Sequence, residues 1–300
     1  MTLPVLVWLV LATVWGSTWL FIKIGLADLP PLTFAGIRFV VASTPLVLWL
    51  WIRGFFRGPI RAIRGRDWRL MVWTGLLTFT VNYALVFWGE TQISSGLAAI
   101  LYTTFPMTGM LLAHWMLKDE PLNLRNVLGV VLAATGVVLI FYNEVDLRGP
   151  MAFLGCAALV TAAGVTAYTD VAIKREGVHI EPVVMTAVQM VVGFVPLLAV
   201  GIAIEGNPLA FHWTGRAVFA LVYLALLGSS LTFVLLYWLI QRIPVTRTMM
   251  IPFMSTLIAV LLGAVVLGEQ LTWRVVAGGA GILGGLGLAV IRRRVPPAHP

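Results

Sequence analysis

Two stretches of the sequence, KDEPLNLRNVLGVVLAATG at residues 118–136 and LGEQLTWRVVAGGAGILGG at residues 267–285, follow a single pattern. In each, a glutamate is followed nine residues later by a glycine and after seven more residues by a second glycine. The matching residues are Glu120, Gly129 and Gly136 in the first stretch and Glu269, Gly278 and Gly285 in the second. All three pairs are 149 residues apart, which is typical of a chain that contains two copies of one structural unit.

Residues outside these two stretches repeat at nearly the same distance. Two prolines recur after 151 residues and one tryptophan after 150: Pro31 as Pro182, Pro45 as Pro196 and Trp88 as Trp238. Pairs from different parts of the chain therefore agree on one offset. The repeat divides the chain into two units, residues 1–146 and 147–300.

The composition places the chain in a membrane. Hydrophobic residues make up 60% of the sequence and charged residues only 11%, and the mean hydropathy is +0.98. A soluble domain carries about 25% charged residues, so this chain lacks the polar groups to cover its own surface in water. Cys156 is the single cysteine, which excludes a disulfide framework and a cysteine-rich zinc site.

Apolar segments of roughly 20 residues, the length of a membrane-spanning helix, follow one another along the whole sequence. Ten of them run approximately over residues 3–26, 32–52, 68–89, 95–117, 124–142, 150–173, 183–204, 216–240, 246–267 and 273–291. Each half then holds five spans, and an odd number makes the second half enter the membrane from the opposite side. The predicted fold is an all-α integral membrane protein of ten transmembrane helices in two inverted-topology five-helix repeats (5+5).

The distribution of Lys and Arg orients these helices, because positively charged loops stay in the cytoplasm. With a cytoplasmic amino terminus, fifteen basic residues lie inside and four outside, the four being Lys23, Arg148, Arg216 and Arg274. The sequence thus predicts a multi-pass protein of the plasma (bacterial inner) membrane with both termini cytoplasmic. The net charge of +8 is explained by this topology and indicates no nucleic-acid partner.

Several motifs together resemble a known transporter family. The segments VWGSTWLFIK (14–23) and PLTFAGIRFVVAS (31–43), with the two glutamate–glycine stretches, resemble the drug/metabolite transporter superfamily, in particular its EamA-type ten-helix exporters. The resemblance covers nearly the whole chain. It implies one membrane domain made of a first EamA-type repeat at 1–146 and a second at 147–300, which carries amino acids or related metabolites, usually outward.

Polar and aromatic residues at bilayer depth are the candidate substrate-binding groups, because such residues in spans mark substrate pathways. The spans near residues 3–26, 68–89, 95–117, 150–173, 216–240 and 246–267 carry them, whereas 124–142 and 273–291 read as scaffold, with small residues for close packing. The candidates are Trp15, Trp19, Phe79, Asn82, Tyr83, Tyr102, Thr103, Tyr168, Ser229, Ser230 and Thr232.

Each candidate also has a purely structural explanation. Serine and threonine hydroxyls in membrane helices often bond to their own backbone, and Arg38 can reach a carbonyl or the interface. Asp170 either pairs with Lys174, four residues later, or acts as a proton carrier. Glu120 and Glu269 are expected to cap the helices that begin shortly after them.

The leading hypothesis is a secondary transporter that exports small metabolites, with amino acids as the favoured substrates, by alternating access around a site at the midplane. No G-x4-G-K-[ST] motif is present, so ATP is not the direct energy source. We expect no enzymatic activity, cofactor or metal, and a monomer suffices. The alternative is efflux of lipophilic cations; a polytopic membrane enzyme or a channel fits the sequence less well.

Overall fold

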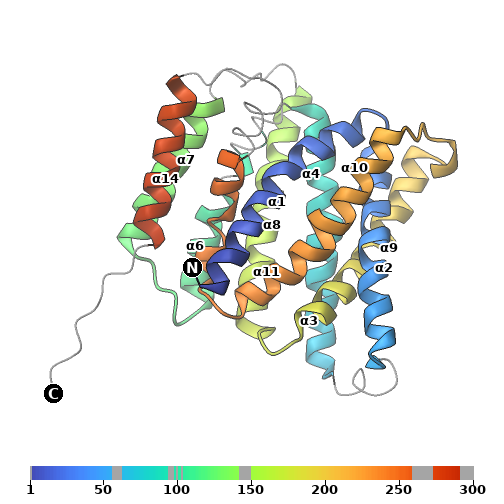
Figure 1. Ribbon diagram of the computed structural model, residues 1–300, viewed down its shortest axis with the longest axis horizontal. Coiled ribbons are helices and arrows are strands. Elements are labelled where there is room, and N and C mark those ends of the chain that lie inside the picture. Colours follow the sequence, from blue (N-terminus) through green and yellow to red (C-terminus); the bar gives the residue numbers. More distant parts are fainter. Residues whose placement is uncertain are drawn as a thin grey trace.

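The structure, a computed structural model, describes residues 2–55, 63–93, 98, 101–102, 104–141, 150–258 and 273–290. Within these residues the chain forms helices and no strands (Figure 1). Six helical stretches are long and apolar enough to cross a membrane: Leu3–Leu26, Pro31–Ile52, Gly65–Gln92, Met151–Glu176, Pro182–Glu205 and Gly215–Ile240. Two shorter apolar helices lie at Leu124–Leu139 and Val276–Leu288. The chain is therefore a multi-pass membrane protein, and all regular structure in its described residues is helical.

Apart from the spans expected at 95–117 and 246–267, the helical stretches begin and end within three residues of the predicted spans. The elements are α1 (Leu3–Leu26), α2 (Pro31–Ile52), α3 (Gly65–Gly75), η3 (Leu76–Asn82), α4 (Tyr83–Gln92), α6 (Thr104–Met116), α7 (Leu124–Phe141), α8 (Pro150–Glu176), α9 (Pro182–Glu205), η5 (Pro208–Ala210), α10 (Gly215–Ala225), η6 (Leu226–Leu231), α11 (Thr232–Ile240), α12 (Val245–Thr248) and α14 (Trp273–Val290). The spans expected at 95–117 and 246–267 include residues outside the described ranges.

Two of the long helices contain a π-helical turn at matching positions. Leu76–Asn82 forms η3 between α3 and α4, and Leu226–Leu231 forms η6 between α10 and α11. The two segments begin 150 residues apart, the distance at which the sequence repeats. Such π-turns occur frequently at functional sites. Both place polar residues deep in the bundle, since Thr78, Asn82, Ser229 and Ser230 are all buried.

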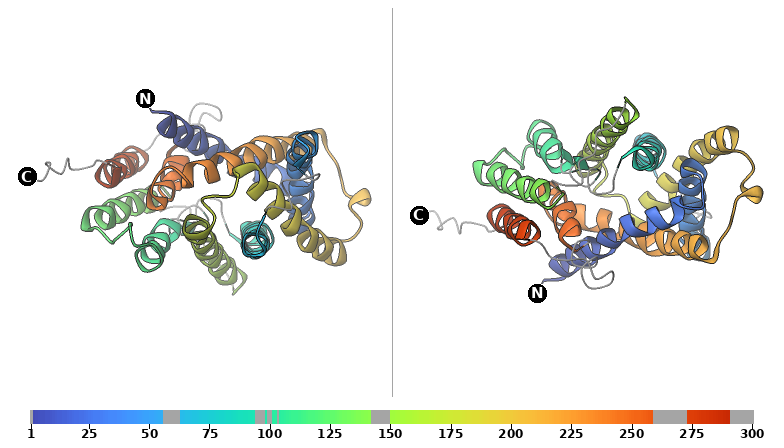
Figure 2. Two further views of the ribbon diagram at one scale, coloured as in Figure 1. Left: turned by 90° about the horizontal axis from the view of Figure 1, so that it is seen from below. Right: turned by 90° about the horizontal axis from the view of Figure 1, so that it is seen from above.

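Helices α7 and α14 form a pair at one end of the bundle, and α2 and α9 lie together toward the other end (Figures 1 and 2). The repeated glycines lie in the first pair. A Cβ atom on Gly136 would meet the Gly278 carbonyl, and one on Gly285 would meet the Gly129 carbonyl. Because glycine has no side chain, the two helix backbones can touch at these positions, as expected of scaffold helices.

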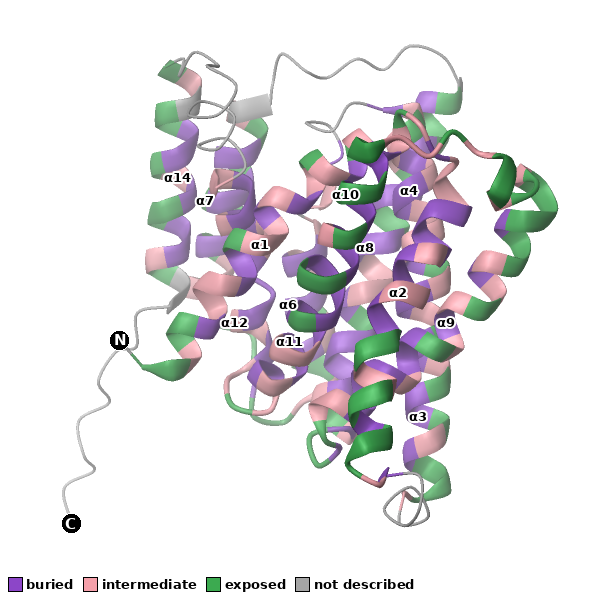
Figure 3. Cartoon of the chain, turned by 45° about the vertical axis from the view of Figure 1, so that its right-hand side comes forward, coloured by how far each residue is buried: buried purple, intermediate pink, exposed green. Residues whose placement is uncertain are grey.

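The outer surfaces of the helices carry large apolar side chains, as lipid contact requires. Phe153 is 73% exposed, Phe219 62% and Ile204 73%, and exposed residues follow one side of α14 (Figure 3). Contiguous apolar surface of this kind is rare on a soluble monomer. The burial pattern therefore agrees with the composition.

Carboxylates bind the first turns of helices from distant parts of the chain. Glu205, at the end of α9, accepts hydrogen bonds from the backbone N–H groups of Leu32 (2.8 Å) and Thr33 (2.7 Å) in α2. These N–H groups have no partner within their own helix, and a negative charge is favourable at a helix amino terminus. Glu205 thereby fixes the start of α2 against α9.

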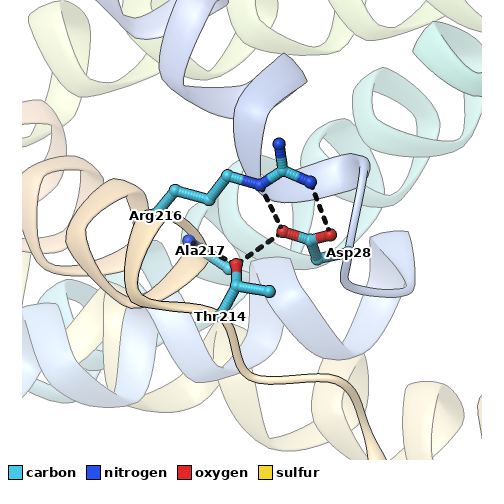
Figure 4. Close-up of polar contacts among 4 residues, drawn as sticks. All are labelled: Asp28, Thr214, Arg216 and Ala217. Atoms are coloured by element: carbon cyan, nitrogen blue, oxygen red, sulfur yellow. Dashed lines mark hydrogen bonds and ion pairs between the residues drawn. The ribbon is translucent and has the colours of Figure 1, made fainter.

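Asp28, in the turn between α1 and α2, binds the start of α10 (Figure 4). Its carboxylate accepts hydrogen bonds from Thr214 Oγ1 (2.6 Å) and from Arg216 Nε (2.9 Å) and Nη2 (3.0 Å). The hydrogen bonds of Arg216 and Thr214 lower the pKa of Asp28 to about 2. Thr214 also accepts from the Ala217 N–H and so caps α10. This contact ties the first loop of the chain to its second half.

Candidate functional site

A cavity lies in the middle of the bundle, between helices from both halves of the chain. It holds about 1030 Å³ of empty space, its open mouth included. Its wall is formed by α1, α2, η3, α4, α8 and α11, together with Tyr102, Phe105 of α6 and residues between 248 and 256. Six of the predicted site residues line it: Trp15, Trp19, Asn82, Tyr83, Tyr102 and Asp170.

Aromatic side chains form one wall of the cavity. The rings of Trp19 and Tyr102 meet edge to face with centroids 5.9 Å apart, and Tyr102 stacks on Phe105 at 6.1 Å. Trp15, one helical turn before Trp19, meets the edge of Phe233 at 6.0 Å. Edge-to-face and offset-stacked pairs are the favoured ring geometries. The wall is therefore a pre-formed apolar surface against which a ligand side chain can be buried.

Three polar atoms around the cavity are buried without a hydrogen-bond partner among the described residues. They are Arg38 Nη1, Asn82 Oδ1 and Ser255 Oγ, and all three residues line the cavity. Buried polar groups in native structures nearly always have a partner. Five other buried atoms without a partner in the described part of the chain lie away from the cavity wall. The three atoms on the wall are the ones that a ligand in the cavity can reach.

Arg38 is a cavity residue that the sequence analysis treated as structural. Its Nε donates to Ser229 Oγ (2.8 Å) and its Nη2 to the Gly228 carbonyl (3.2 Å), so the expected carbonyl contact is present. The guanidinium also lies 5.2 Å from the ring centre of Tyr83 and 5.4 Å from that of Phe39. The side chain is 1% exposed. A charged residue at bilayer depth is a sequence signal of a functional site, and this signal could have identified Arg38.

The expected pairing of Asp170 with Lys174 is absent. Lys174 Nζ instead donates to the carbonyls of Ile240 (2.6 Å) and Ile243 (2.9 Å), at the carboxyl end of α11. A cation is favourable there because of the helix dipole. Asp170 is 5% exposed and is the one acidic side chain among the described residues of the cavity wall.

Three predicted hydroxyls are not on the cavity wall; each is bonded to a backbone carbonyl. Ser229 accepts from Arg38 and donates to the Leu224 carbonyl (2.9 Å). Ser230 donates to the Ala42 carbonyl of α2 (2.6 Å), and Thr232 to the Ser229 carbonyl (3.4 Å). These are the hydrogen bonds that the structural explanation expects of the three residues.

Two predicted aromatic residues also lie off the wall. Phe79 is fully buried behind it, with its ring 4.9 Å from Phe39 and 4.7 Å from Phe233. Tyr168 is 41% exposed and packs on Trp73 at 5.5 Å. Thr103 lies outside the described residues. The lining residues that the prediction did not select are Thr18, Ile22, Arg38, Thr78, Val86, Phe105, Thr166, Phe233, Leu236, Thr248, Pro252, Ser255 and Thr256.

Glu120 caps a different helix from the expected one. Its carboxylate accepts from the backbone N–H groups of Val245 (2.7 Å) and Thr246 (3.0 Å), at the start of α12. The helix that follows it, α7, is instead preceded by Asn123, whose side chain accepts from the Arg125 N–H (3.0 Å). Glu269 lies outside the described residues. Glu120 therefore joins the turn before α7, in the first half, to the segment that carries Thr248 and Ser255 of the cavity.

Replacing the Glu120 carboxylate by an amide should weaken its hydrogen bonds to the start of α12 without removing them. We expect Glu120→Gln to lower the free energy of unfolding by about 1 kcal/mol, because charge-assisted hydrogen bonds are roughly twice as strong as neutral ones. The measurement is unfolding of the purified protein by increasing SDS in mild detergent. Glu181→Gln is the control, because Glu181 precedes α9, is exposed and makes no side-chain cap. Equal loss in both variants would contradict the assigned role.

The sequence is similar to transporter proteins throughout its length. A model of the EamA-like transporter family matches residues 2–142 and 153–291. Similar curated proteins include "Uncharacterized transporter YoaV" of Bacillus subtilis, 28% identical over 88% of this chain and 89% of the relative. Others are "Uncharacterized inner membrane transporter YedA" of Escherichia coli (25% identical, 86% and 81% covered) and "Protein PagO" of Salmonella typhimurium (22%, 97% and 94%).

The fold is also similar to a solved crystal structure. The two chains superpose with a TM-score of 0.80 over 96% of each, at 16% sequence identity. At this identity the likeness concerns the fold alone.

Proposed function

Because the chain belongs to the EamA-like transporter family, we propose that this membrane transporter exports small metabolites, with amino acids as substrates, across the plasma membrane by alternating access. The observation that carries the proposal is the central cavity, where an aromatic wall faces a few unpartnered polar groups. Sites for small molecules combine a mostly apolar lining with a few polar groups that fix the ligand's orientation. Relatives named as transporters support transport over catalysis.

We further propose ten spans in two inverted repeats, at residues 1–146 and 147–300. Three observations support this architecture. The family model matches the chain twice, and the π-turns begin at matching places in both halves. In addition, the repeated glycines meet across the α7–α14 contact, with Gly129 facing Gly285 and Gly136 facing Gly278. Inverted repeats are the architecture of many alternating-access transporters.

Alternating access requires contacts that close one end of the cavity and can open. In the proposed topology both termini are cytoplasmic, and the segment around 242–247 faces the cytoplasm. Glu120 holds this segment through the Val245 and Thr246 N–H groups, and Lys174 holds the Ile243 carbonyl beside it. Trp8 Nε1 also donates to the Arg247 carbonyl (2.9 Å). We propose that these contacts separate when the cavity opens to the cytoplasm.

The driving force that we propose is a proton gradient, with Asp170 as the proton carrier. Its carboxylate lies on the cavity wall, and Lys174 is engaged elsewhere. Export of lipophilic cations is the second candidate, because a carboxylate among aromatic rings also suits a cation. The guanidinium of Arg38 on the same wall disfavours it.

The purified protein in lipid vesicles tests the proposal. We expect uptake of radiolabelled L-leucine and L-phenylalanine into vesicles, and accumulation that depends on an imposed pH gradient. Empty vesicles and vesicles with tetraphenylphosphonium serve as comparisons. Transport of tetraphenylphosphonium with no transport of any of the twenty amino acids would replace the proposal by its alternative. Accumulation that is indifferent to the pH gradient would remove the proton-carrier role.

A further inference from the structure

We propose that the cavity recognises a zwitterion in a fixed orientation, with the ligand carboxylate on Arg38 and the ligand ammonium on Asp170. The inference rests on the proposed function and specifies how the substrate is bound. It assigns to Arg38 a binding role and explains why two opposite charges face one apolar space. The ligand class is an α-amino acid with an apolar side chain.

Arg38 is positioned as an anion-binding group. Ser229 and Gly228 bind two of its nitrogens, and aromatic rings flank the guanidinium. This leaves Nη1 as a buried donor without an acceptor. No carboxylate in the described part of the chain lies within 4.0 Å of the guanidinium. A ligand carboxylate supplies the missing acceptor, and arginine is the side chain best suited to bind it.

Asp170 is positioned as the matching cation-binding group. No Lys, Arg or His nitrogen of the described residues lies within 4.0 Å of its carboxylate. The nearest basic residue along its helix, Lys174, is held by two carbonyls of the segment after α11 and of α11 itself. Asn82 Oδ1, also on the wall and without a donor, offers a second acceptor. An ammonium group, with three N–H donors, fits these oxygens.

The two charges together favour a ligand that carries both signs. A buried charge without a counter-charge is strongly unfavourable in an apolar environment. A simple anion would supply the acceptor that Arg38 Nη1 lacks and leave Asp170 without a cation, and a simple cation would do the reverse. A zwitterion satisfies both and adds no net charge to the cavity. The ligand's carboxylate and ammonium would bind the polar groups of the wall. Its apolar side chain would pack against Trp15, Trp19 and Phe105.

Glu90 is the other buried carboxylate that has no hydrogen-bond donor among the described residues. It does not line the cavity and makes no ion pair with Arg38 within 4.0 Å. Glu90 is near enough for its charge to act on Arg38, but it gives Nη1 no acceptor, and that hydrogen bond is left to the ligand carboxylate.

Three related compounds separate the two ends of the ligand. L-leucine carries both charges, L-leucine methyl ester lacks the carboxylate, and N-acetyl-L-leucine lacks the ammonium. We expect the purified wild-type protein to bind leucine roughly 10- to 100-fold more tightly than either derivative in equilibrium dialysis, the range for losing one charged hydrogen bond. A wild-type protein that binds either derivative as tightly as leucine would refute the inference without any variant.

The variants assign each preference to one residue. Arg38→Gln should reduce the preference for leucine over the methyl ester to about threefold or less, with the preference over N-acetyl-leucine retained. Asp170→Asn should do the opposite. Asn82→Ala, a smaller change on the wall, should weaken only the preference over N-acetyl-leucine, because it removes the second acceptor for the ammonium. Variants are compared only if they elute as single peaks in size-exclusion chromatography.

Several outcomes would overturn the inference. The inference is wrong if Arg38→Gln and Asp170→Asn each keep the preference for leucine over the two derivatives. It is also wrong if each variant loses its preference over both derivatives, as expected of a merely structural role. Arg38→Gln is the substitution at risk of not folding, in which case the wild-type series and Asn82→Ala decide the question. Leucine transport without discrimination against the derivatives would refute the zwitterion site and leave amino-acid export intact. Binding of tetraphenylphosphonium alone would refute both.

Discussion

Tyr102→Ala should reduce substrate affinity by roughly 5- to 150-fold while the amount of folded protein in the membrane stays unchanged. Tyr102 forms the aromatic wall with Trp19 and Phe105, and its hydroxyl lies 3.4 Å from Thr166 Oγ1. Losing one buried apolar contact of this kind is worth roughly 1–3 kcal/mol, and 1.4 kcal/mol is tenfold in affinity. The measurement is the concentration dependence of leucine uptake into vesicles.

Two further variants complete this experiment. Asn82→Ala should also reduce transport, because it removes the unpartnered Oδ1 from the wall. Thr135→Ala should leave both transport and expression unchanged, since Thr135 is exposed on α7 and its hydroxyl donates to the Val131 carbonyl of the same helix (2.8 Å). Full transport by Tyr102→Ala and Asn82→Ala would place the substrate elsewhere, among α8, α11 and the segment that follows α12.

Gly285→Ala should destabilise the bundle by about 3 kcal/mol, the upper end of the range for overpacked sites. The added Cβ would meet the Gly129 carbonyl, and it would lie 2.7 Å from the backbone nitrogen of Ala133. Backbone atoms of a helix cannot rotate away as a side chain can, so α7 and α14 must separate. Unfolding by SDS in mild detergent measures the loss.

Gly287→Ala is the matched control, two residues further along the same helix. A Cβ atom there meets nothing within 4 Å, and replacing glycine in a helix by alanine is favourable by roughly 0.5–1 kcal/mol. This variant should be as stable as the wild type or slightly more stable. If the two variants unfold together, the close contact between α7 and α14 does not support the fold.

The fold class could be predicted from the sequence because its signals are large. Long apolar runs specify helices in lipid, and the repeated glycines indicated the scaffold pair α7–α14, where the backbones do meet. The cavity was predictable only in part. In a soluble protein the polar face of a helix points to the outside. Here apolar side chains face both the lipid and the cavity, so polarity does not separate the two faces. Thr166 and Tyr168 lie two residues apart, and only the packed bundle reveals that the first lines the cavity and the second faces outward.

The errors about charged residues have a related cause. The spacing of Asp170 and Lys174 suits a pair within one helix, but carbonyls at the end of α11 compete for the lysine and win. Glu120 likewise had a nearby helix to cap and caps a distant one. Sequence spacing predicts partners within one helix. It does not predict free backbone groups at helix ends that folding brings close from distant parts of the chain.

The caps provided by Glu120 and Glu205 cross between the halves in opposite directions. The first binds backbone amides at 245 and 246, and the second binds amides at 32 and 33. Every amino acid except proline supplies such an amide, whereas the acceptor must be a carboxylate to supply the charge. Natural selection is therefore expected to hold the two glutamates fixed and to let the residues that they contact drift. Neither half of the gene can then diversify alone, since each encodes an anchor for a helix of the other.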